Sequence, residues 1–552
     1  MDRTGILIRR IRLFYLHKDF QMTESTEKEV TELLKDLSSL IVDNSMDISI
    51  HETEKEKELF KLLQHNFAPQ YEAVFDDKMA PKTVVVIPSL SLDPVILSKI
   101  EGIVNYEERL LCLLLLLRMP RTHVVYITST PIDPLIIDYY LHLLPGITGD
   151  HARRRLHFFS CHDSSVASLT EKILARPRLI KRILQSIPDG HLAHLACFNV
   201  TELERKLAVT LGLPVYGCNP DLLFWGTKSG SREIFRECDV LIPPGYENLE
   251  NEEQIIKALA DLYYANPAIR KAVIKMNDGF SGEGNAVFSY KKVLPNVAIE
   301  AQIQQQLQTE LEIVATHLSY ASFIEKFRSM GGIVEAFIEG EPTSSPSVQC
   351  RINPMGKIDI ISTHDQLMGG RDNQIFLGGT FPADKAYCVE IGELGKKISA
   401  VMKDKGVLGR FGVDFLSVKE NNVWKHYAIE INLRKGGTTH PFIMLEFLTN
   451  GDYNAETGKY VLPNGEEKYY LFTDNLQDEK FKGLTPYDLM DIAMLNQLHY
   501  DNTKEEGVMF HLIGALSQYG KLGLVCIASS LARANYFYEE TSRLLKLECT
   551  SY

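Results

Sequence analysis

The chain has 552 residues, enough for three or four domains and a large hydrophobic core. Apolar residues make up 45% of it and charged residues 24%, the balance of a soluble globular protein. A net charge of -13 disfavours non-specific nucleic-acid binding, which needs basic surface to neutralise phosphates. The nine cysteines include no Cys-x-x-Cys pair, so we expect reduced, buried thiols, and their spacing gives no support to a zinc site.

The longest apolar run, Leu110–Leu117, is far shorter than the roughly 20 residues that a membrane-spanning helix needs. We therefore expect a buried helix there and no membrane association. The basic, amphipathic segment 1–20 has a pattern that organelle-targeting segments share. Asp2 and the lack of serines in this segment favour a solvated arm instead, and we expect a cytoplasmic protein.

Residues 1–80 are rich in charge and predict helices at Glu24–Leu40 and Glu52–His65, with no catalytic grouping. From Pro81 onward, short β-branched runs such as Thr83–Pro88 alternate with apolar helical patterns such as Glu107–Leu117. This alternation predicts an open α/β sheet. No Gly-x-Gly-x-x-Gly motif follows the first strand, so a conventional dinucleotide site has no support. Further expected elements are strands at Val124–Thr128, Leu156–Ser160 and Ala193–Asn199, and a helix at Pro134–Leu144.

The second half of the chain has a different pattern. From Asp221 to about Leu448, helices and strands alternate with antiparallel hairpins, and a polar stretch at Thr449–Lys468 follows. The tail, Thr485–Cys549, has helical patterns around one short strand at Leu522–Ile527. We therefore expect four parts, namely a helical extension at 1–80, an α/β domain at 81–220, a central domain at 221–450 and a small C-terminal domain at 480–552.

Within the stretch 272–285, a strand that ends in Lys275 runs into a loop rich in glycine and serine. Backbone N–H groups of such a loop can approach phosphate oxygens because no side chains block them, and the lysine adds a point charge. The loop is not a P-loop, since the lysine precedes the glycines. A flexible hairpin with a solvated lysine explains the same residues equally well.

The stretch 333–341 is an apolar strand interrupted by acids. Such a strand can offer backbone groups to adenine and carboxylates to amine or ribose hydroxyl groups. A half-buried strand with outward-facing acids has the same pattern, so this stretch alone does not decide between the two interpretations.

The strongest pattern is a pair of strands at 411–416 and 427–434. Residues i and i+2 of a strand share a face, so Glu430, Asn432 and Arg434 should point the same way. With Asp414 they would offer two carboxylates and an amide oxygen, the hard ligands that magnesium prefers. The arginine can neutralise a transferring phosphoryl group. The alternative is a half-exposed strand whose acids and arginine face water.

The register of this hairpin decides where Asp414 points. If Val418 pairs with Trp424, Asp414 lies opposite Ala428 and shares the polar face. A change of one residue would turn it away.

The order of these patterns over about 220–445 resembles the ATP-grasp superfamily. A closer likeness is to peptide ligases of the pheganomycin type. It is carried by GTKSGSREIF, NDGFSGEGNAVF, STHDQ, GRFGVDF and EINLRKGGTTHP, and the tail resembles the small C-terminal domain found with these ligases in GVMFHLI, YGKLGLVCIASS and ARANYFYEE. The resemblance implies an ATP-grasp fold, of mixed α/β and α+β class, with a lid at about 228–340 and a metal and phosphate floor at 341–445. An open α/β domain would precede it and a small α+β domain would follow.

The resemblance also implies which residues bind the nucleotide and the metal. Lys228 and Lys275 look like the two nucleotide lysines, and Asp414, Glu430 and Asn432 look like the ligands of Mg²⁺ or Mn²⁺. The remaining nucleotide contacts would come from the loop residues Gly279, Ser281, Gly282, Gly284 and Asn285 and from the hinge residues Glu335, Phe337, Ile338 and Glu341.

Candidate catalytic residues are Arg434, Lys275 and Arg351, an arginine that could reach an acyl-phosphate site. Candidate substrate contacts are His364, Asp365, Gly437, Thr438 and Thr439. Ordinary strand polarity and an ordinary turn explain the same residues, and His364 is equally compatible with a structural role.

The implied activity is an ATP-dependent ligase that joins a small-molecule carboxylate to an amine, with an amino acid or peptide as substrate and ADP and phosphate as products. We expect no nucleic-acid or membrane partner, and the sequence is compatible with a homodimer. A non-catalytic ATP-binding module of the same fold is the main competing hypothesis. A kinase or a carboxylase is a further one, although no Met-Lys-Met motif of a biotin carrier is present.

Overall fold

The computed structural model describes residues 54–75, 77–92, 97–98, 100–279, 284–295, 298–315, 317–369 and 375–549. The helix expected at Glu24–Leu40 lies outside the described residues, and the next one appears as α3 (Glu54–His65). Within the described part, no helix has the length and the apolar run that crossing a bilayer requires.

The first unit is a four-stranded parallel sheet in the order β3-β2-β1-β4, as the alternation of strands and helices predicted. Val84 and Val86 pack on one face with the apolar helix η1, whereas Val85 and Ile87 pack on the other with α3 and α8 to α10. Because both faces are covered, the run Val84–Ile87 of β1 is apolar throughout rather than alternating. The bounds are β1 (Lys82–Ile87), β2 (Thr122–Thr128), β3 (Leu156–Ser160), β4 (Ala193–Cys197), η1 (Ile103–Arg118), α4 (Phe67–Val74), α6 (Pro134–His142), α7 (Gly149–Arg153), α8 (Leu169–Leu174), α9 (Pro177–Ser186) and α10 (Glu202–Leu211).

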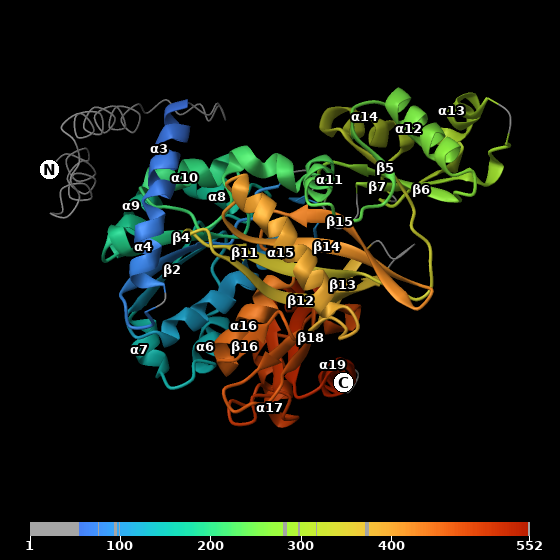
Figure 1. The fold of residues 1–552 in the computed structure, drawn as a ribbon. Coiled ribbons are helices and arrows are strands. Elements are labelled where there is room, and N and C mark those ends of the chain that lie inside the picture. The colour runs from blue at the N-terminus through green and yellow to red at the C-terminus, as the bar shows by residue number, and fades with distance from the viewer. Residues whose placement is uncertain are drawn as a thin grey trace.

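The second unit is a five-stranded antiparallel sheet in the order β5-β9-β6-β7-β8, which we call the lid (Figure 1). Ala272 and Ile274 of β6 pack against three helices that cover the outer face of this sheet. Lys275 and Val273 alternate with them and face the rest of the molecule. The bounds are β5 (Gly245–Leu249), β6 (Lys271–Met276), β7 (Asn285–Ser289), β8 (Leu311–Ile313), β9 (Gly332–Ala336), α12 (Glu252–Ala265), α13 (Ile299–Glu310) and α14 (Tyr320–Met330).

The third unit is a nine-stranded sheet in the order β10-β14-β11-β12-β13-β18-β20-β19, with β15 also paired to β14. The C-terminal strands thus extend the central sheet instead of forming a sheet of their own. The polar stretch expected at Thr449–Lys468 contains a hairpin of β16 (Asp452–Asn454) and β17 (Lys459–Val461). The strands are β10 (Thr343–Ser344), β11 (Pro346–Ile352), β12 (Ile358–Gly369), β13 (Ile375–Phe381), β14 (Gly409–Glu420), β15 (Val423–Asn432), β18 (Tyr469–Gln477), β19 (Gly507–His511) and β20 (Lys521–Ala528).

Helices of this third unit join it to the other two. α16 packs on η1 of the first unit, and α11 packs on β15 next to the lid (Figure 1). The central floor therefore lies between the parallel sheet, the lid and the C-terminal strands. The bounds are α11 (Lys228–Glu237), α15 (Cys388–Asp404), α16 (Thr439–Thr449), α17 (Pro486–Leu495), α18 (Leu516–Tyr519) and α19 (Leu531–Glu548).

Candidate active site

The β14–β15 hairpin has a different register from the one expected. Val418 pairs with Lys425 instead of Trp424, and at this register Asp414 would lie opposite the apolar Ile429. A β-bulge after Asp414 adds one residue on the β15 side, so that Asp414 lies opposite Glu430. The shared polar face was thus expected correctly, but the pairing that was expected to produce it is wrong.

Three side chains converge on this face. The Asn432 Nδ2 atom donates to Asp414 Oδ2 at 2.8 Å and to Glu430 Oε1 at 3.2 Å. Gln366 Nε2 donates to the other Asp414 oxygen at 2.8 Å. Two carboxylates held this close inside a protein need compensating partners, and here these are the amide N–H groups and the ammonium group of Lys228. The donor set of two carboxylates and one amide fits a hard divalent cation.

The two carboxyl groups of this face have pKa values shifted in opposite directions. Burial and the neighbouring Glu430 charge raise the pKa of Asp414 to about 7. Burial also acts to raise the pKa of Glu430, but Lys228, Lys275 and Arg434 outweigh it and lower that pKa. Glu430 is therefore the carboxylate that the cations of the site keep ionised.

Lys228 is the first residue of α11 and forms an ion pair with Glu430. The hydroxyl of Thr227 caps this helix by accepting a hydrogen bond from the Gly230 N–H group at 3.0 Å. Because α11 packs on β15, the cap places the lysine directly over the metal face.

Lys275 lies at the inner face of the lid, with its Nζ 2.6 Å from Glu335 Oε1. Arg232 Nη1 lies 2.9 Å from the other Glu335 oxygen. The Glu335 carboxylate is buried and held by both cations. This arrangement does not support the contact expected between that carboxylate and the nucleotide, and Glu335 orients Lys275 instead.

A cavity of about 1250 Å³ lies between the lid and the central sheet. It brings together residues from widely separated parts of the chain. Ser281 and Gly282 lie outside the described residues. The predicted residues that line the cavity are Lys228, Lys275, Gly279, Gly284, Asn285, Glu335, Phe337, Ile338, Glu341, Asp365, Asp414, Glu430, Asn432, Arg434, Gly437 and Thr438.

Comparison with known proteins identifies the family to which this cavity and its lining residues belong. Residues 222–313 and 288–456 match the family described as IQCH-like, ATP-grasp, and residues 488–541 match the PGM1 C-terminal domain. The structure is similar to a biotin carboxylase–β,γ-ATP complex from Campylobacter jejuni, with a TM-score of 0.50 and 14% identity, over 85% of this chain and 95% of the other. The chain is an ATP-grasp superfamily protein. It has the ATP-grasp fold, with an N-terminal parallel α/β sheet and a C-terminal domain.

Two curated relatives of this ATP-grasp protein have different descriptions. One is the L-propargylglycine–L-glutamate ligase of Streptantibioticus cattleyicolor, 29% identical over 452 residues, which are 79% of this chain and 89% of the relative. The other is the IQ motif-containing protein H of Danio rerio, 22% identical over 512 residues. That match covers 82% of this chain but 47% of the relative.

Three residues expected in the ATP-grasp site lie elsewhere. Arg351 is absent from the described residues that line the cavity, and its Nη2 donates to Asp359 Oδ2 at 2.8 Å. The catalytic role expected for Arg351 is therefore not supported, because its guanidinium group already has a partner on β12.

His364 and Thr439 are also absent from the described cavity lining. His364 is completely buried, with its Nε2 2.6 Å from the Tyr470 hydroxyl, and burial lowers its pKa to about 3. Strand alternation explains this, since the neighbouring Asp365 faces the cavity. The Thr439 hydroxyl accepts from the Gly436 N–H group at 3.0 Å and holds the turn, so neither residue supports the expected substrate contact.

Part of the ATP-grasp cavity is lined by residues that sequence reasoning missed. Arg109 of η1 and Lys521 of β20 are both buried there. The Arg109 guanidinium carbon lies 4.5 Å from the Tyr106 ring centroid and 4.7 Å from the Phe198 ring centroid. Its Nη1 is 3.2 Å from Asp474 Oδ2. The sequence contained one signal for Arg109, which directly precedes the apolar run at Leu110–Leu117. A charged residue next to a buried helix is itself buried and needs polar partners.

Proposed function

We propose that this ATP-grasp protein is a ligase that uses ATP to join a carboxylate to an amine. The substrate carboxylate, of an amino acid or peptide, becomes an acyl phosphate, and the products are an amide, ADP and phosphate. The observation that carries this proposal is the metal face of Asp414, Glu430 and Asn432, which shares one cavity with Lys228, Lys275 and Arg434. The relative named L-propargylglycine–L-glutamate ligase supports the same class of reaction.

ATP would bind between the lid and the floor. Phe337 and Ile338 follow the edge of β9 and offer backbone groups and apolar surface for adenine. Lys228 and Lys275 would face the phosphates. Asp414, Glu430 and Asn432 would hold Mg²⁺, which when bound neutralises phosphate charge.

In the first step, a carboxylate oxygen of the substrate attacks the γ-phosphorus, and the bond to the oxygen that bridges the β- and γ-phosphates breaks. ADP takes the electron pair of that bond. The guanidinium group of Arg434 and the ammonium group of Lys275 stabilise the negative charge that spreads over the transferring group. Catalysis is therefore mostly positioning and charge neutralisation.

In the second step, the amine nitrogen attacks the acyl carbon, the bond from that carbon to the phosphate oxygen breaks, and the nitrogen loses a proton. The lid excludes water, which would otherwise hydrolyse the acyl phosphate. The Arg109 and Lys521 end of the cavity offers positive charge for a second carboxylate, such as the one every amino acid carries.

A second candidate function is a nucleotide-binding module without catalysis. The match to the IQCH-like family and to IQ motif-containing protein H favours it, since neither description names a reaction. The retained metal face weighs against it, because a module that only binds nucleotide does not need two carboxylates packed together at a cost in stability.

The proposal is tested by incubating the protein with ATP, Mg²⁺ and single or paired amino acids. We expect ADP and phosphate with an active pair, and a hydroxamate of the substrate acid when hydroxylamine replaces the amine. The Glu430→Gln variant serves as the inactive control. Release of AMP would contradict the acyl-phosphate route, and ATP left unchanged with every pair would favour the binding module.

A further inference from the structure

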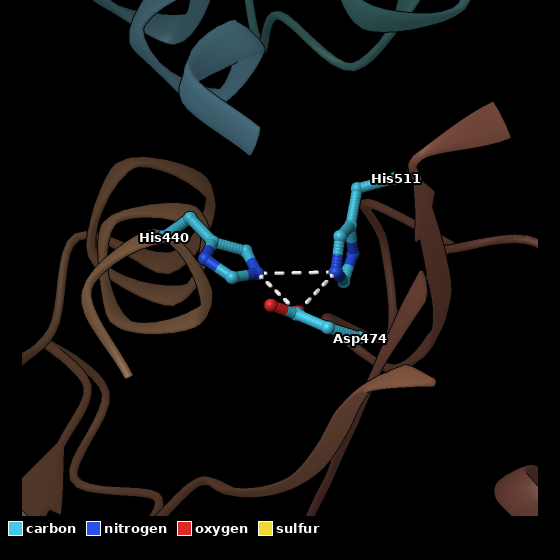
Figure 2. A group of neighbouring side chains, drawn as sticks. All are labelled: His440, Asp474 and His511. Carbon is cyan, nitrogen blue, oxygen red and sulfur yellow. Dashed lines mark hydrogen bonds and ion pairs between the residues drawn. The ribbon is translucent and has the colours of Figure 1, made fainter. Parts of the chain in front are cut away.

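Two histidines and an aspartate converge on one another (Figure 2), and the aspartate lines the cavity. His440 comes from the first turn of α16, Asp474 from β18 and His511 from the end of β19. The Nε2 atoms of the two histidines are 3.1 Å apart. Asp474 Oδ1 lies 2.8 Å from the His511 Nε2 atom and 3.1 Å from the His440 Nε2 atom.

The spacing of these three atoms matches that of a metal site. Zinc bound by imidazole nitrogen and carboxylate oxygen has bonds of about 2.0–2.1 Å, which places tetrahedral ligand atoms roughly 3.3 Å from one another. The observed triangle is only a few tenths of an ångström smaller. An ion bound to all three atoms would lie on the order of 1 Å above their plane, with a fourth position left free.

Hydrogen bonding alone satisfies this cluster poorly. A carboxylate only accepts, so both Nε2 atoms would have to carry protons and direct them at the same oxygen. With a cation in the centre, the Nε2 lone pairs become ligands and the Nδ1 atoms carry the protons.

The surroundings also fit a bound cation. His440 and His511 are almost completely buried, and Asp474 lines the cavity. The second Asp474 oxygen accepts a hydrogen bond from Arg109. Carboxylates that bind metals commonly accept such a hydrogen bond from a neighbouring group. A Cβ atom at Gly523 would lie 2.2 Å from His511 Nε2, so only glycine leaves room for this ring position.

We propose that His440, Asp474 and His511 bind one Zn²⁺ ion, whose fourth position faces the cavity. The two imidazoles and one carboxylate are a donor set that zinc accepts readily and that magnesium does not favour. The ion fastens α16 to the C-terminal strands β18 and β19. Through the Asp474–Arg109 pair it also reaches η1, so it joins the third unit of the molecule to the first. This site does not depend on the proposed ligase activity.

The test uses the full chain, purified, stripped with a chelator, and dialysed against micromolar zinc in the presence of millimolar Mg²⁺. We expect about one zinc per chain by elemental analysis, and a visible absorption band of tetrahedral Co²⁺ when cobalt replaces zinc. His511→Gln and Asp474→Asn should lose at least tenfold in zinc affinity. His364→Gln, at an equally buried histidine outside the cluster, should keep it.

A Glu430→Gln variant separates this site from the nucleotide metal. It should lose Mg²⁺-dependent turnover but keep its zinc, whereas His511→Gln should lose zinc. If the unmodified protein took up no zinc and gave no tetrahedral cobalt band, or if His511→Gln bound as much zinc as the unmodified chain, the cluster would be a hydrogen-bonded network only. The cobalt spectrum of the unmodified protein decides the matter even if the variants fold poorly.

Discussion

Asp414 and Glu430 lie directly opposite each other on β14 and β15 because one extra residue, Ile429, bulges out of β15 between Ala428 and Glu430. Without the bulge, Ile429 would occupy the place of Glu430. The backbone N–H group of Ile431, just beyond the bulge, donates to the Ser231 hydroxyl of α11 at 3.0 Å. A contact from a distant helix therefore stabilises the irregularity that assembles the metal face.

Substitution of Glu430 by glutamine should abolish most activity while the fold is kept. The change preserves volume but removes one ligand charge, and we expect turnover to fall about 100-fold or more at saturating ATP. The thermal midpoint should change little, since Lys228 loses one partner at a partly exposed site. Glu420→Gln, at an exposed acid on the same hairpin paired with Lys425, is the control and should keep full turnover. Full Mg²⁺-dependent turnover of Glu430→Gln would remove Glu430 from the metal site.

Substitution of Lys275 by alanine should weaken ATP binding or turnover by about 100-fold, because a positioned charge beside the phosphates is lost. The Glu335 carboxylate keeps Arg232 as a partner, so the lid should stay folded. Calorimetric titration with ATP and steady-state kinetics measure the two effects separately. Lys292→Ala, at an exposed lysine of the lid, is the matched control. If affinity and turnover of Lys275→Ala both equalled those of the control, Lys275 would not contact the nucleotide.

Local sequence patterns were sufficient for much of the fold. The run Thr83–Pro88 predicted β1, and the period of two in 427–434 predicted which side chains share a face of β15. Both signals involve only near neighbours in the sequence, so no tertiary information was needed.

Relationships across the chain were not predictable in this way. The bulge depends on Ser231 of another helix, and the Arg109–Asp474 pair joins residues 365 positions apart. Arg351 was singled out because its residue type suits a phosphate site, whereas its partner Asp359 is set by the β11–β12 register, which the sequence pattern did not reveal. The histidine and aspartate cluster has no regular spacing in the sequence, since each member comes from a different element.

Glu108 of η1 should make stability depend on pH. Burial raises its pKa from the ordinary 4.5 to about 7, although the Gly514 N–H group donates to it. The folded state thus holds this proton more tightly than the unfolded chain does. The resulting stabilisation is complete below about pH 4.5 and is lost as pH rises through 7, by about 3 kcal/mol for a shift of this size.

Glu108→Gln should remove this dependence, because the amide stays neutral and its oxygen can still accept from Gly514. Denaturant unfolding at pH 5 and pH 8 measures the effect, with exposed Glu101→Gln as the control. The stability lost between the two pH values should be smaller in Glu108→Gln than in the control. An equal loss in both variants would mean that Glu108 is not the group responsible.

Substitution of Lys521 by methionine should raise the KM for the carboxylate-bearing substrate at least tenfold and leave the KM for ATP unchanged. Lys521 lines the cavity beyond the metal face, and its Nζ lies 2.8 Å from the Tyr106 hydroxyl. Methionine keeps the length and apolar stem of the side chain, so the packing against Tyr106 is preserved while the charge is lost. Lys482→Met, at an exposed lysine paired with Glu479, should alter neither constant. Arg109 and Lys521 lie on separate segments, and both contact the Tyr106 ring. A loss of ATP affinity instead of substrate affinity would show that this part of the cavity serves the nucleotide.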